Sequence, residues 1–258
     1  MNRFFVDQSA INGTSISITD RDDIKHITKV LRMDIDEIVE ISDTSQFEYV
    51  AKITSIFHDQ INLTAVEKTD FIREPFIKIG LFQGMPKQGK MESIIQKSVE
   101  LGANKIIPVY TERSVPQDKG NSKNKIERWQ KVSDEAAKQC KRGILPYVSV
   151  PVTFAQLINE LEFYDHIIFP YENEKGNTIK DALLKIKKLN KKAVEQDILG
   201  SSGNNIAIII GPEGGFSKYE ADKLVEIGAF CVSLGKTILR TETAGPAAIS
   251  MVMYELEL

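Results

Sequence analysis

The sequence predicts an α/β protein in which a small β-rich domain precedes a larger domain with a mostly parallel sheet. Three observations support this fold class. Short alternating apolar runs fill the first seventy residues, a pattern typical of strands with one buried face. After Pro75, apolar runs alternate with helical patterns, which predicts parallel strands covered by helices. Ile206 to Ile210 is apolar throughout, as expected for a strand buried on both faces of a sheet.

Residues 1–72 form the predicted β-rich domain. Its expected strands are Phe4–Val6, Ile16–Ile18, Ile38–Ile41, Tyr49–Ile56 and Ile61–Val66. One helix interrupts them, capped by Asp20 or Asp22, with Ile24, Ile27, Val30 and Leu31 as its apolar stripe. A break near Asp70 to Pro75 is expected to be the linker, because the residue before a proline is held extended.

Residues 73–258 form the predicted parallel-sheet domain. Its expected strands are Phe76–Phe82, Lys105–Val109, Val148–Val150, Ile167–Phe169, Ile206–Ile210 and Ala229–Leu234. Its expected helices are Met91–Leu101, Ser122–Lys141, Phe154–Leu161, Thr178–Leu189, one capped by Ser217 and Glu220, and one starting near Thr243. Pro246 is placed in the first turn of the last helix, where proline is tolerated. Lys187 to Asn205 is expected to become a polar loop.

Glycine turns follow two of the buried strands, and they indicate a ligand site. Gly211-Pro212-Glu213-Gly214-Gly215 follows the strand at Ile206–Ile210, and Gly235 follows Leu234. Such strand ends are where open α/β sheets build their sites. Neither nucleotide-phosphate fingerprint is present, because a P-loop would need glycine at Phe230 and the glycines of the first turn lack the dinucleotide spacing. A pocket lined by backbone groups remains, suited to an uncharged ring.

Composition excludes several other classes of protein. No apolar run is long enough to span a bilayer, and the N-terminus lacks the apolar core of a secretory signal. The two cysteines and three histidines are scattered, so neither a disulfide framework nor a metal site is expected. Net charge is −3, but residues 85–146 contain 13 Lys or Arg and 7 Asp or Glu, an excess of +6. This segment is a candidate surface for phosphate, or a solvated pair of helix faces.

Two segments resemble the paired signatures of the RsmE family, which are SPOUT-class methyltransferases. They are Ile210-Gly211-Pro212-Glu213-Gly214-Gly215-Phe216 and the run from Leu234 to Ala244, LGKTILRTETA. Further similarity lies at Arg3-Phe4-Phe5, His26–Arg32, Ile94–Gly102, Glu112–Val115 and Glu135–Arg142. The resemblance covers nearly the whole chain. It departs in two turns, where the family usually has glycine and this chain has Asp36-Glu37 and Asp43-Thr44-Ser45-Gln46.

The resemblance implies a fold, a reaction and partners. The expected fold is a PUA-like β-barrel for RNA binding, followed by a SPOUT α/β domain with a trefoil knot. The expected reaction is methylation of N3 of a uridine in 16S rRNA of the small ribosomal subunit, with S-adenosyl-L-methionine as cofactor. A cytoplasmic homodimer acting on a small-subunit particle is also implied. Alternatives are a SPOUT enzyme acting on another RNA or a ribose 2′-oxygen, and a non-catalytic RNA-binding scaffold.

Candidate site residues follow from the same motifs. Arg240 is expected to stabilise charge on the uracil, or else to pair with Glu213 or Glu242. Either carboxylate is a candidate acceptor for the N3 proton, or a helix N-terminal charge. The expected cofactor-binding residues are Pro170, Ile210, Gly211, Gly214, Gly215, Leu234, Gly235, Ile238, Leu239, Thr243 and Ala244. The expected RNA-binding residues are Arg3, Arg32, Lys87, Lys90, Arg113 and Arg142.

Overall fold

The fold comes from a computed structural model that describes residues 1–87, 89–114, 122–195 and 205–257. The chain divides into two compact units, each described by itself. The first unit joins Met1–Glu74 to Ala137–Leu145, and the second joins Pro75–Ala136 to Pro146–Leu258. The boundary after Glu74 lies close to the predicted one at residue 72. No sequence pattern had indicated that residues 137–145 belong with the N-terminal unit.

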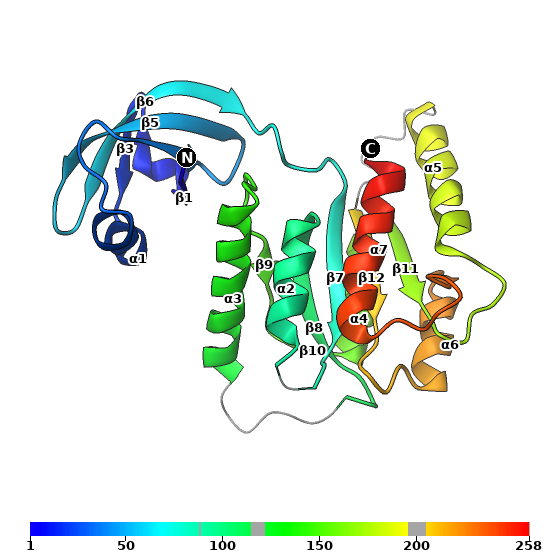
Figure 1. The fold of residues 1–258 in the computed structure, drawn as a ribbon. Helices are drawn as coiled ribbons and strands as arrows, with labels where there is room; N and C mark the ends of the chain where they lie inside the picture. Colours follow the sequence, from blue (N-terminus) through cyan, green and yellow to red (C-terminus); the bar gives the residue numbers. More distant parts are fainter. Residues whose placement is uncertain (88, 115–121, 196–204, 258) are drawn as a thin grey trace. The chain divides into compact units, whose positions relative to one another are not determined.

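The first unit contains a six-stranded sheet in the order β1-β4-β5-β6-β3-β2 (Figure 1). Only β1 and β4 pair in parallel, and the other neighbours are antiparallel. The strands are β1 (Arg3–Phe5), β2 (Ile11–Asn12), β3 (Ser15–Ile18), β4 (Ile38–Ser42), β5 (Phe47–Ile56) and β6 (Ile61–Asp70). Every second residue of β4 and of the first half of β6 is buried, as period-two alternation predicts.

The helical segment of this unit begins where the sequence predicted it. A separate 3₁₀ turn lies at Gln8–Ala10, before β2. The helix α1 (Arg21–Lys25) continues directly into a π-helical turn at His26–Val30. Asp20 is the cap, accepting a hydrogen bond of 2.9 Å from the Asp23 amide. Ile24 and Ile27 are buried in the core, but Val30 is 64% exposed, so its predicted place in the apolar stripe is wrong. Leu31, the last residue of the predicted stripe, is partly buried and packs against the core.

Two turns of the first unit have a glycine-like backbone at residues that are not glycine. Asp36 has φ of 74° and Thr44 has φ of 60°, values that non-glycine residues adopt at a cost. The turn at Thr44 is held by Asp43, whose Oδ1 accepts amide hydrogen bonds from Ser45, Gln46 and Phe47 at 2.9–3.0 Å. These bonds offset the backbone strain at Thr44.

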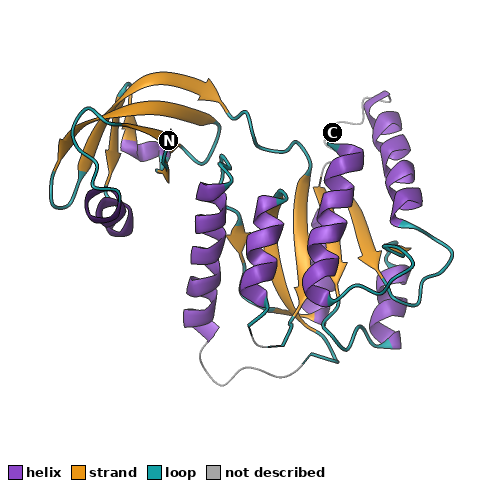
Figure 2. Cartoon of the chain, viewed as in Figure 1, coloured by secondary structure: helices purple, strands orange, loops and turns teal. Residues whose placement is uncertain are grey.

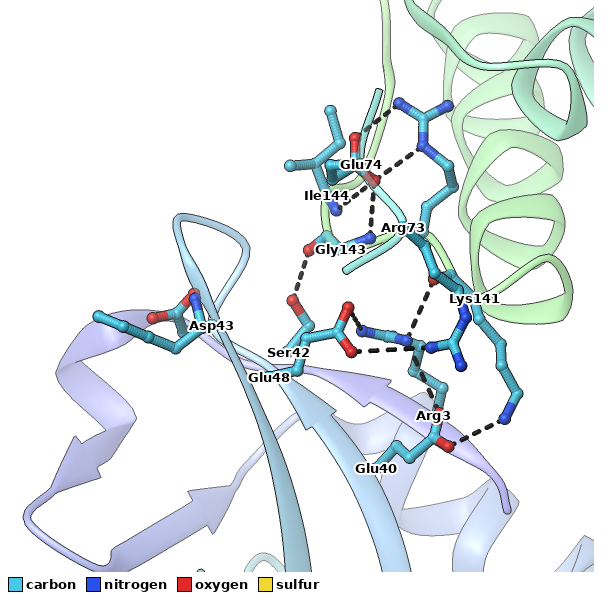
Figure 3. Close-up of polar contacts among 12 residues, drawn as sticks. Arg3, Glu40, Ser42, Asp43, Glu48, Arg73, Glu74, Lys141, Gly143 and Ile144 are labelled. Carbon is cyan, nitrogen blue, oxygen red and sulfur yellow. Dashed lines mark hydrogen bonds and ion pairs between the residues drawn. The ribbon is translucent and has the colours of Figure 1, made fainter. Parts of the chain in front are cut away.

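Buried charges join residues 137–145 to the rest of the first unit (Figure 3). The Arg3 guanidinium lies 2.6 Å from Glu48 and donates to the Lys141 carbonyl at 3.1 Å. Glu74 accepts Arg142 Nε at 2.8 Å and Nη2 at 3.0 Å. The same carboxylate also accepts the Gly143 amide at 2.7 Å. A buried ion of either sign is costly unless it is paired in this way.

The second unit is built on a parallel sheet in the order β10-β8-β7-β12-β11-β13, with β9 paired to β8. The strands are β7 (Lys78–Gly84), β8 (Ala103–Tyr110), β9 (Tyr147–Val148), β10 (Val152–Thr153), β11 (His166–Pro170), β12 (Asn205–Ile210) and β13 (Phe230–Val232). β12 lies between β7 and β11, which explains why Ile206 to Ile210 is buried throughout.

Helices cover this sheet on both faces (Figure 2). They are α2 (Met91–Glu100), α3 (Ser122–Gln139), α4 (Phe154–Glu160), a 3₁₀ turn at Leu161–Phe163, α5 (Ile179–Glu195), α6 (Lys218–Glu226) and α7 (Thr241–Leu256). Ala207 and Ile209 of β12 pack in one cluster with α4 and α6. On the other face, α7 contacts β7 and β12 and lies between α2 and α5 (Figure 1). The predicted layered α/β architecture is therefore confirmed.

Most of the predicted helix ends differ from the observed ones by one or two residues, and the differences in α7 and α5 change the interpretation of the sequence. α7 begins at Thr241, two residues earlier than expected, so Pro246 lies inside the helix and not in its first turn. Proline there has no amide hydrogen for the Glu242 carbonyl, the acceptor one helical turn earlier. α5 continues to Glu195, so the loop predicted from Lys187 is helical over its first part. The rest of that predicted loop, residues 196–204, lies outside the described residues.

Across the described ranges, the structure contains no helix long and apolar enough to cross a membrane.

Candidate active site

A cavity of about 870 Å³ lies at the carboxyl end of the sheet in the second unit. Its walls come from the segments that follow β11, β12 and β13, together with the start of α7. These strands are parallel neighbours, so their carboxyl ends meet at one edge. The turns predicted to surround a ligand pocket, after Phe169, Ile210 and Leu234, all line this cavity.

The segment after β11 is fastened to the segment after β13 by backbone hydrogen bonds. The Ser233 amide donates to the Asn177 carbonyl at 2.8 Å, and the Ile179 amide donates to the Ser233 carbonyl at 3.0 Å. Glu174 supports this loop by accepting the Gly176 and Asn177 amides at 2.6 and 2.9 Å. These hydrogen bonds from the Asn177 and Gly176 amides lower the pKa of the Glu174 carboxyl.

A buried hydrogen-bond chain holds the start of α7 against the glycine turn. Thr241 donates from Oγ1 to the Gly211 carbonyl at 2.7 Å and accepts from Gln83 Nε2 at 2.9 Å. Gln83 is fully buried at the end of β7, and Thr241 is also buried. This chain fixes the relative positions of β7, the turn after β12 and α7, because removing one partner would leave a buried polar group unpaired.

The glycine turn itself is a tight structure that other elements support. Gly215 has φ of 66°, in the left-handed region, and its amide donates to the Pro212 carbonyl at 2.9 Å. Arg113 donates to the Gly214 carbonyl at 3.1 Å. Immediately after the turn, the predicted capping box of Ser217 and Glu220 is present at the start of α6. The turn is therefore fixed at both ends.

Lys90 connects both candidate catalytic carboxylates. Its Nζ lies 2.9 Å from Glu213 Oε1 and 3.0 Å from Glu242 Oε2. The hydrogen bonds that Lys90 donates to Glu213 and then to Glu242 raise the pKa of Lys90. Burial works to raise the pKa of Glu213, but hydrogen bonds led by that from Lys90 outweigh it and lower the pKa. A backbone hydrogen bond, followed by the bond from Lys90, lowers the pKa of Glu242.

The structure brings most of the predicted cofactor and catalytic residues together. Of the predicted cofactor-binding residues, all but Gly214 and Thr243 line the cavity. Arg240 and Glu213 line it too, and Glu242 reaches it through Lys90. Within the part of the chain that the structure describes, Lys90 is the ion-pair partner of both carboxylates, and Arg240 forms an ion pair with neither.

The predicted RNA-binding residues do not form one surface. Arg32, Lys87 and Arg113 are exposed, although Arg113 also supports the glycine turn. Lys90 faces the cavity. Arg3 and Arg142 are each only 4% exposed and lie in the ion pairs described above, which argues against phosphate binding by either guanidinium. Both resemble phosphate contacts in sequence because charge alone does not report burial.

Sequence reasoning missed several residues that shape the cavity. Glu174 and Thr178 lie in the segment after β11, where only the strand end at Pro170 had been noticed. Gln83 lies just past the predicted strand Phe76–Phe82, and the structure includes it in β7. Among the described residues, no group of three or more His, Cys, Asp or Glu side chains is arranged to hold a metal ion.

Gly84→Ala is expected to disturb the cavity. A Cβ atom at Gly84 would lie 2.5 Å from both Cδ and N of Pro212, so the backbone of the glycine turn would have to move. We expect the free energy of unfolding to fall by roughly 1–3 kcal/mol and cofactor affinity to fall with it. Urea denaturation and calorimetric titration measure these effects.

Gly245→Ala is the matched control for that prediction. Its added Cβ would meet Gln83 and Leu81 at 3.5 Å, an ordinary contact, and alanine favours the helix in which Gly245 lies. Equal losses in both variants would contradict the assigned role of close packing between Gly84 and the turn.

Comparison with known proteins shows which family the chain belongs to. Residues 73–253 match the RNA methyltransferase domain, and residues 18–65 match the RNA methyltransferase PUA domain. The chain is 34% identical to "Ribosomal RNA small subunit methyltransferase E" of Bacillus subtilis over 100% of this chain and 98% of that protein. It is also 34% identical to the protein of the same name from Buchnera aphidicola of Acyrthosiphon pisum, over 87% of this chain and 82% of that one.

Solved structures agree with this assignment. A methyltransferase from Legionella pneumophila, in complex with the bound cofactor SAM, is 27% identical, with a TM-score of 0.78 over 98% of this chain and 96% of that one. Ribosomal RNA small subunit methyltransferase E from Neisseria gonorrhoeae shares the fold at 24% identity, with a TM-score of 0.81 over 98% and 97% of the two chains. The chain therefore belongs to the ribosomal RNA small subunit methyltransferase E family of RNA methyltransferases.

Proposed function

We propose that this protein transfers the methyl group of S-adenosylmethionine to N3 of a uridine in 16S rRNA. The observation that carries this proposal is the cavity at the carboxyl edge of the sheet. The backbone of the glycine turn and the guanidinium of Arg240 both line this cavity. The chain that contains it belongs to an RNA methyltransferase family. The intact cavity also favours an enzyme over a non-catalytic RNA-binding scaffold.

The residues present fit the cofactor. A volume of about 870 Å³ lies within the range of small-molecule sites. Backbone groups around Leu234, Gly235 and Leu239 would hold an adenine ring, and Pro170 and Gly211 line the same cavity. When bound, S-adenosylmethionine supplies an electrophilic methyl group on a sulfonium, so the protein's task is positioning and electrostatics.

Chemistry at uracil N3 requires the loss of a proton and the stabilisation of negative charge. A bond forms between N3 and the methyl carbon as the carbon–sulfur bond breaks, and the N3 proton leaves to a base. Charge then spreads to the adjacent carbonyl oxygens, where a guanidinium such as that of Arg240 stabilises it. Glu213 and Glu242 are the candidate acceptors for this proton, and both are held by Lys90.

RNA is proposed to approach with its target base unpaired or flipped, since an N3 atom is not accessible inside a duplex. Arg32, Lys87 and Arg113 are the exposed predicted phosphate contacts. We also propose a cytoplasmic homodimer with a knotted C-terminal segment. Support for a dimer comes from α5 and α7, which contact each other and carry exposed Leu184, Leu189 and Tyr254.

The test is methyl transfer from labelled S-adenosylmethionine onto small-subunit particles and onto naked 16S rRNA, followed by nucleoside analysis. We expect 3-methyluridine. Label on a ribose or on another base would overturn the assigned position. Absence of cofactor binding would overturn the enzyme assignment and favour a scaffold. The matched control is the Arg240→Ala variant in the same assay.

A further inference from the structure

We propose that Lys90 is a positioning residue for methyl transfer, whose ammonium group joins the three chain segments around the cavity through Glu213 and Glu242. This inference rests on the proposed function. It assigns Lys90 a role different from the RNA contact predicted from sequence. The ammonium group acts through the two carboxylates and is not required to touch the substrate.

The geometry brings together three segments that are distant in sequence. Lys90 ends the loop after β7, Glu213 lies in the turn after β12, and Glu242 lies in the first turn of α7. One ammonium group contacts both carboxylates, at 2.9 and 3.0 Å. The Glu213 carboxylate also accepts the Lys87 amide, at 3.2 and 3.1 Å from its two oxygens, so the turn is fastened to the loop twice.

Without this cation, the carboxylates of Glu213, which lines the cavity, and Glu242 would face each other beside the cavity. Like charges that share a site disfavour each other's ionisation. The side chains of Lys90, Glu213 and Glu242 are 31%, 24% and 23% exposed, so water screens the pairs only in part. Lys90 therefore keeps both carboxylates ionised and holds them in fixed positions.

Other charged groups also face this cluster. Arg240, at the start of α7, also lowers the pKa of Glu242, with a smaller effect than the backbone hydrogen bond and Lys90. The remaining charged residues that line the cavity are Glu172, Glu174, Lys175 and Lys236. Neither ion pair of Lys90 involves these four residues.

The sign of the pH effect follows from these pKa directions. Both carboxylates have lowered pKa values, so they remain ionised further into acid than an ordinary glutamate. Removing Lys90 raises both values. If the ionised carboxylates support the reaction, activity is then lost at a higher pH on the acid side, and the ratio of variant to wild-type kcat/KM increases with pH.

The experiment compares Lys90→Met, Lys90→Arg and Lys97→Met in the full-length protein. Lys97 is exposed on α2, the helix that follows Lys90, and it lies outside the cavity, so it controls for the loss of one positive charge. We expect Lys90→Met to lower kcat/KM on the order of tenfold on the acid side of the pH profile. We also expect the acid limb of that profile to move to a higher pH. Lys90→Arg should restore the profile in large part, and Lys97→Met should match the wild type.

Amide hydrogen exchange gives a readout that is independent of activity. Lys90→Met should speed exchange in residues 211–216 and 241–244, and Lys90→Arg should reverse this. Unchanged exchange together with an unmoved acid limb would overturn the positioning role. If the wild-type protein transfers no methyl group, the proposed function is wrong. The exchange data would still decide whether Lys90 fastens the three segments.

Discussion

Arg240→Ala is expected to lower kcat for methyl transfer by about 10²–10³-fold, the loss typical of removing one preorganised charge-stabilising donor. Arg240 lines the cavity and precedes α7 as its N-cap residue. The competing role, pairing with Glu213 or Glu242 to hold the fold, is met by Lys90 in the structure. Arg240 is exposed, so its loss should leave the free energy of unfolding within about 0.5 kcal/mol of wild type.

Single-turnover kinetics with saturating cofactor measures this loss, and calorimetry measures cofactor binding. Arg240→Lys keeps the charge without the planar fork and should fall between alanine and wild type. Lys218→Ala removes one exposed positive charge outside the cavity and should retain full turnover. Near-normal turnover in Arg240→Ala, with normal binding, would remove Arg240 from the chemistry.

Glu74→Ala is expected to cost about 3–5 kcal/mol of stability in the first unit, because breaking a buried ion pair strands its partner. The Glu74 side chain is 13% exposed and that of Arg142 is 4% exposed. The carboxylate also accepts the amides of Gly143 and Ile144, at 2.7 and 3.3 Å (Figure 3). Alanine would therefore release residues 137–145 from the unit that they complete.

Urea denaturation measures the loss, and hydrogen exchange locates it. Exchange should rise in residues 137–145 and in β1 and β4, while β7 and β12 keep their protection, because two units need not unfold together. Glu226→Ala breaks the exposed pair between Lys223 and Glu226 and should cost less than about 1 kcal/mol. Equal small losses in both variants would show that residues 137–145 are held by other contacts.

Local signals in the sequence were sufficient for most elements and for the location of the cavity. The capping box of Ser217 and Glu220 and the buried run of β12 are local patterns, and both appear as predicted. Parallel strands that end in glycine turns must place those turns at one edge of the sheet. The cofactor-binding list therefore describes the cavity wall well, with Gly214 and Thr243 as its exceptions.

Charges were the part that sequence reasoning placed poorly. In the sequence, nothing distinguishes Arg3, Arg142 and Lys90 from exposed residues that contact phosphate. In the structure, Arg3 and Arg142 are buried in the first unit, and Lys90 joins two carboxylates beside the cavity. The role of a charge depends on which residues lie near it, and the partners of these three residues are 37 to 152 residues away in the chain. Such distances leave no periodic pattern to read.

The sequence by itself determined the two-part α/β fold, the strand ends that make the site, and the family. Periodicity, capping and glycine turns act over a few residues, so they can be read along the chain. Only the tertiary structure decided that residues 137–145 complete the N-terminal unit and that Lys90 holds Glu213 and Glu242. Both facts depend on long-range contacts, in which burial and charge pairing are settled by the packed fold alone.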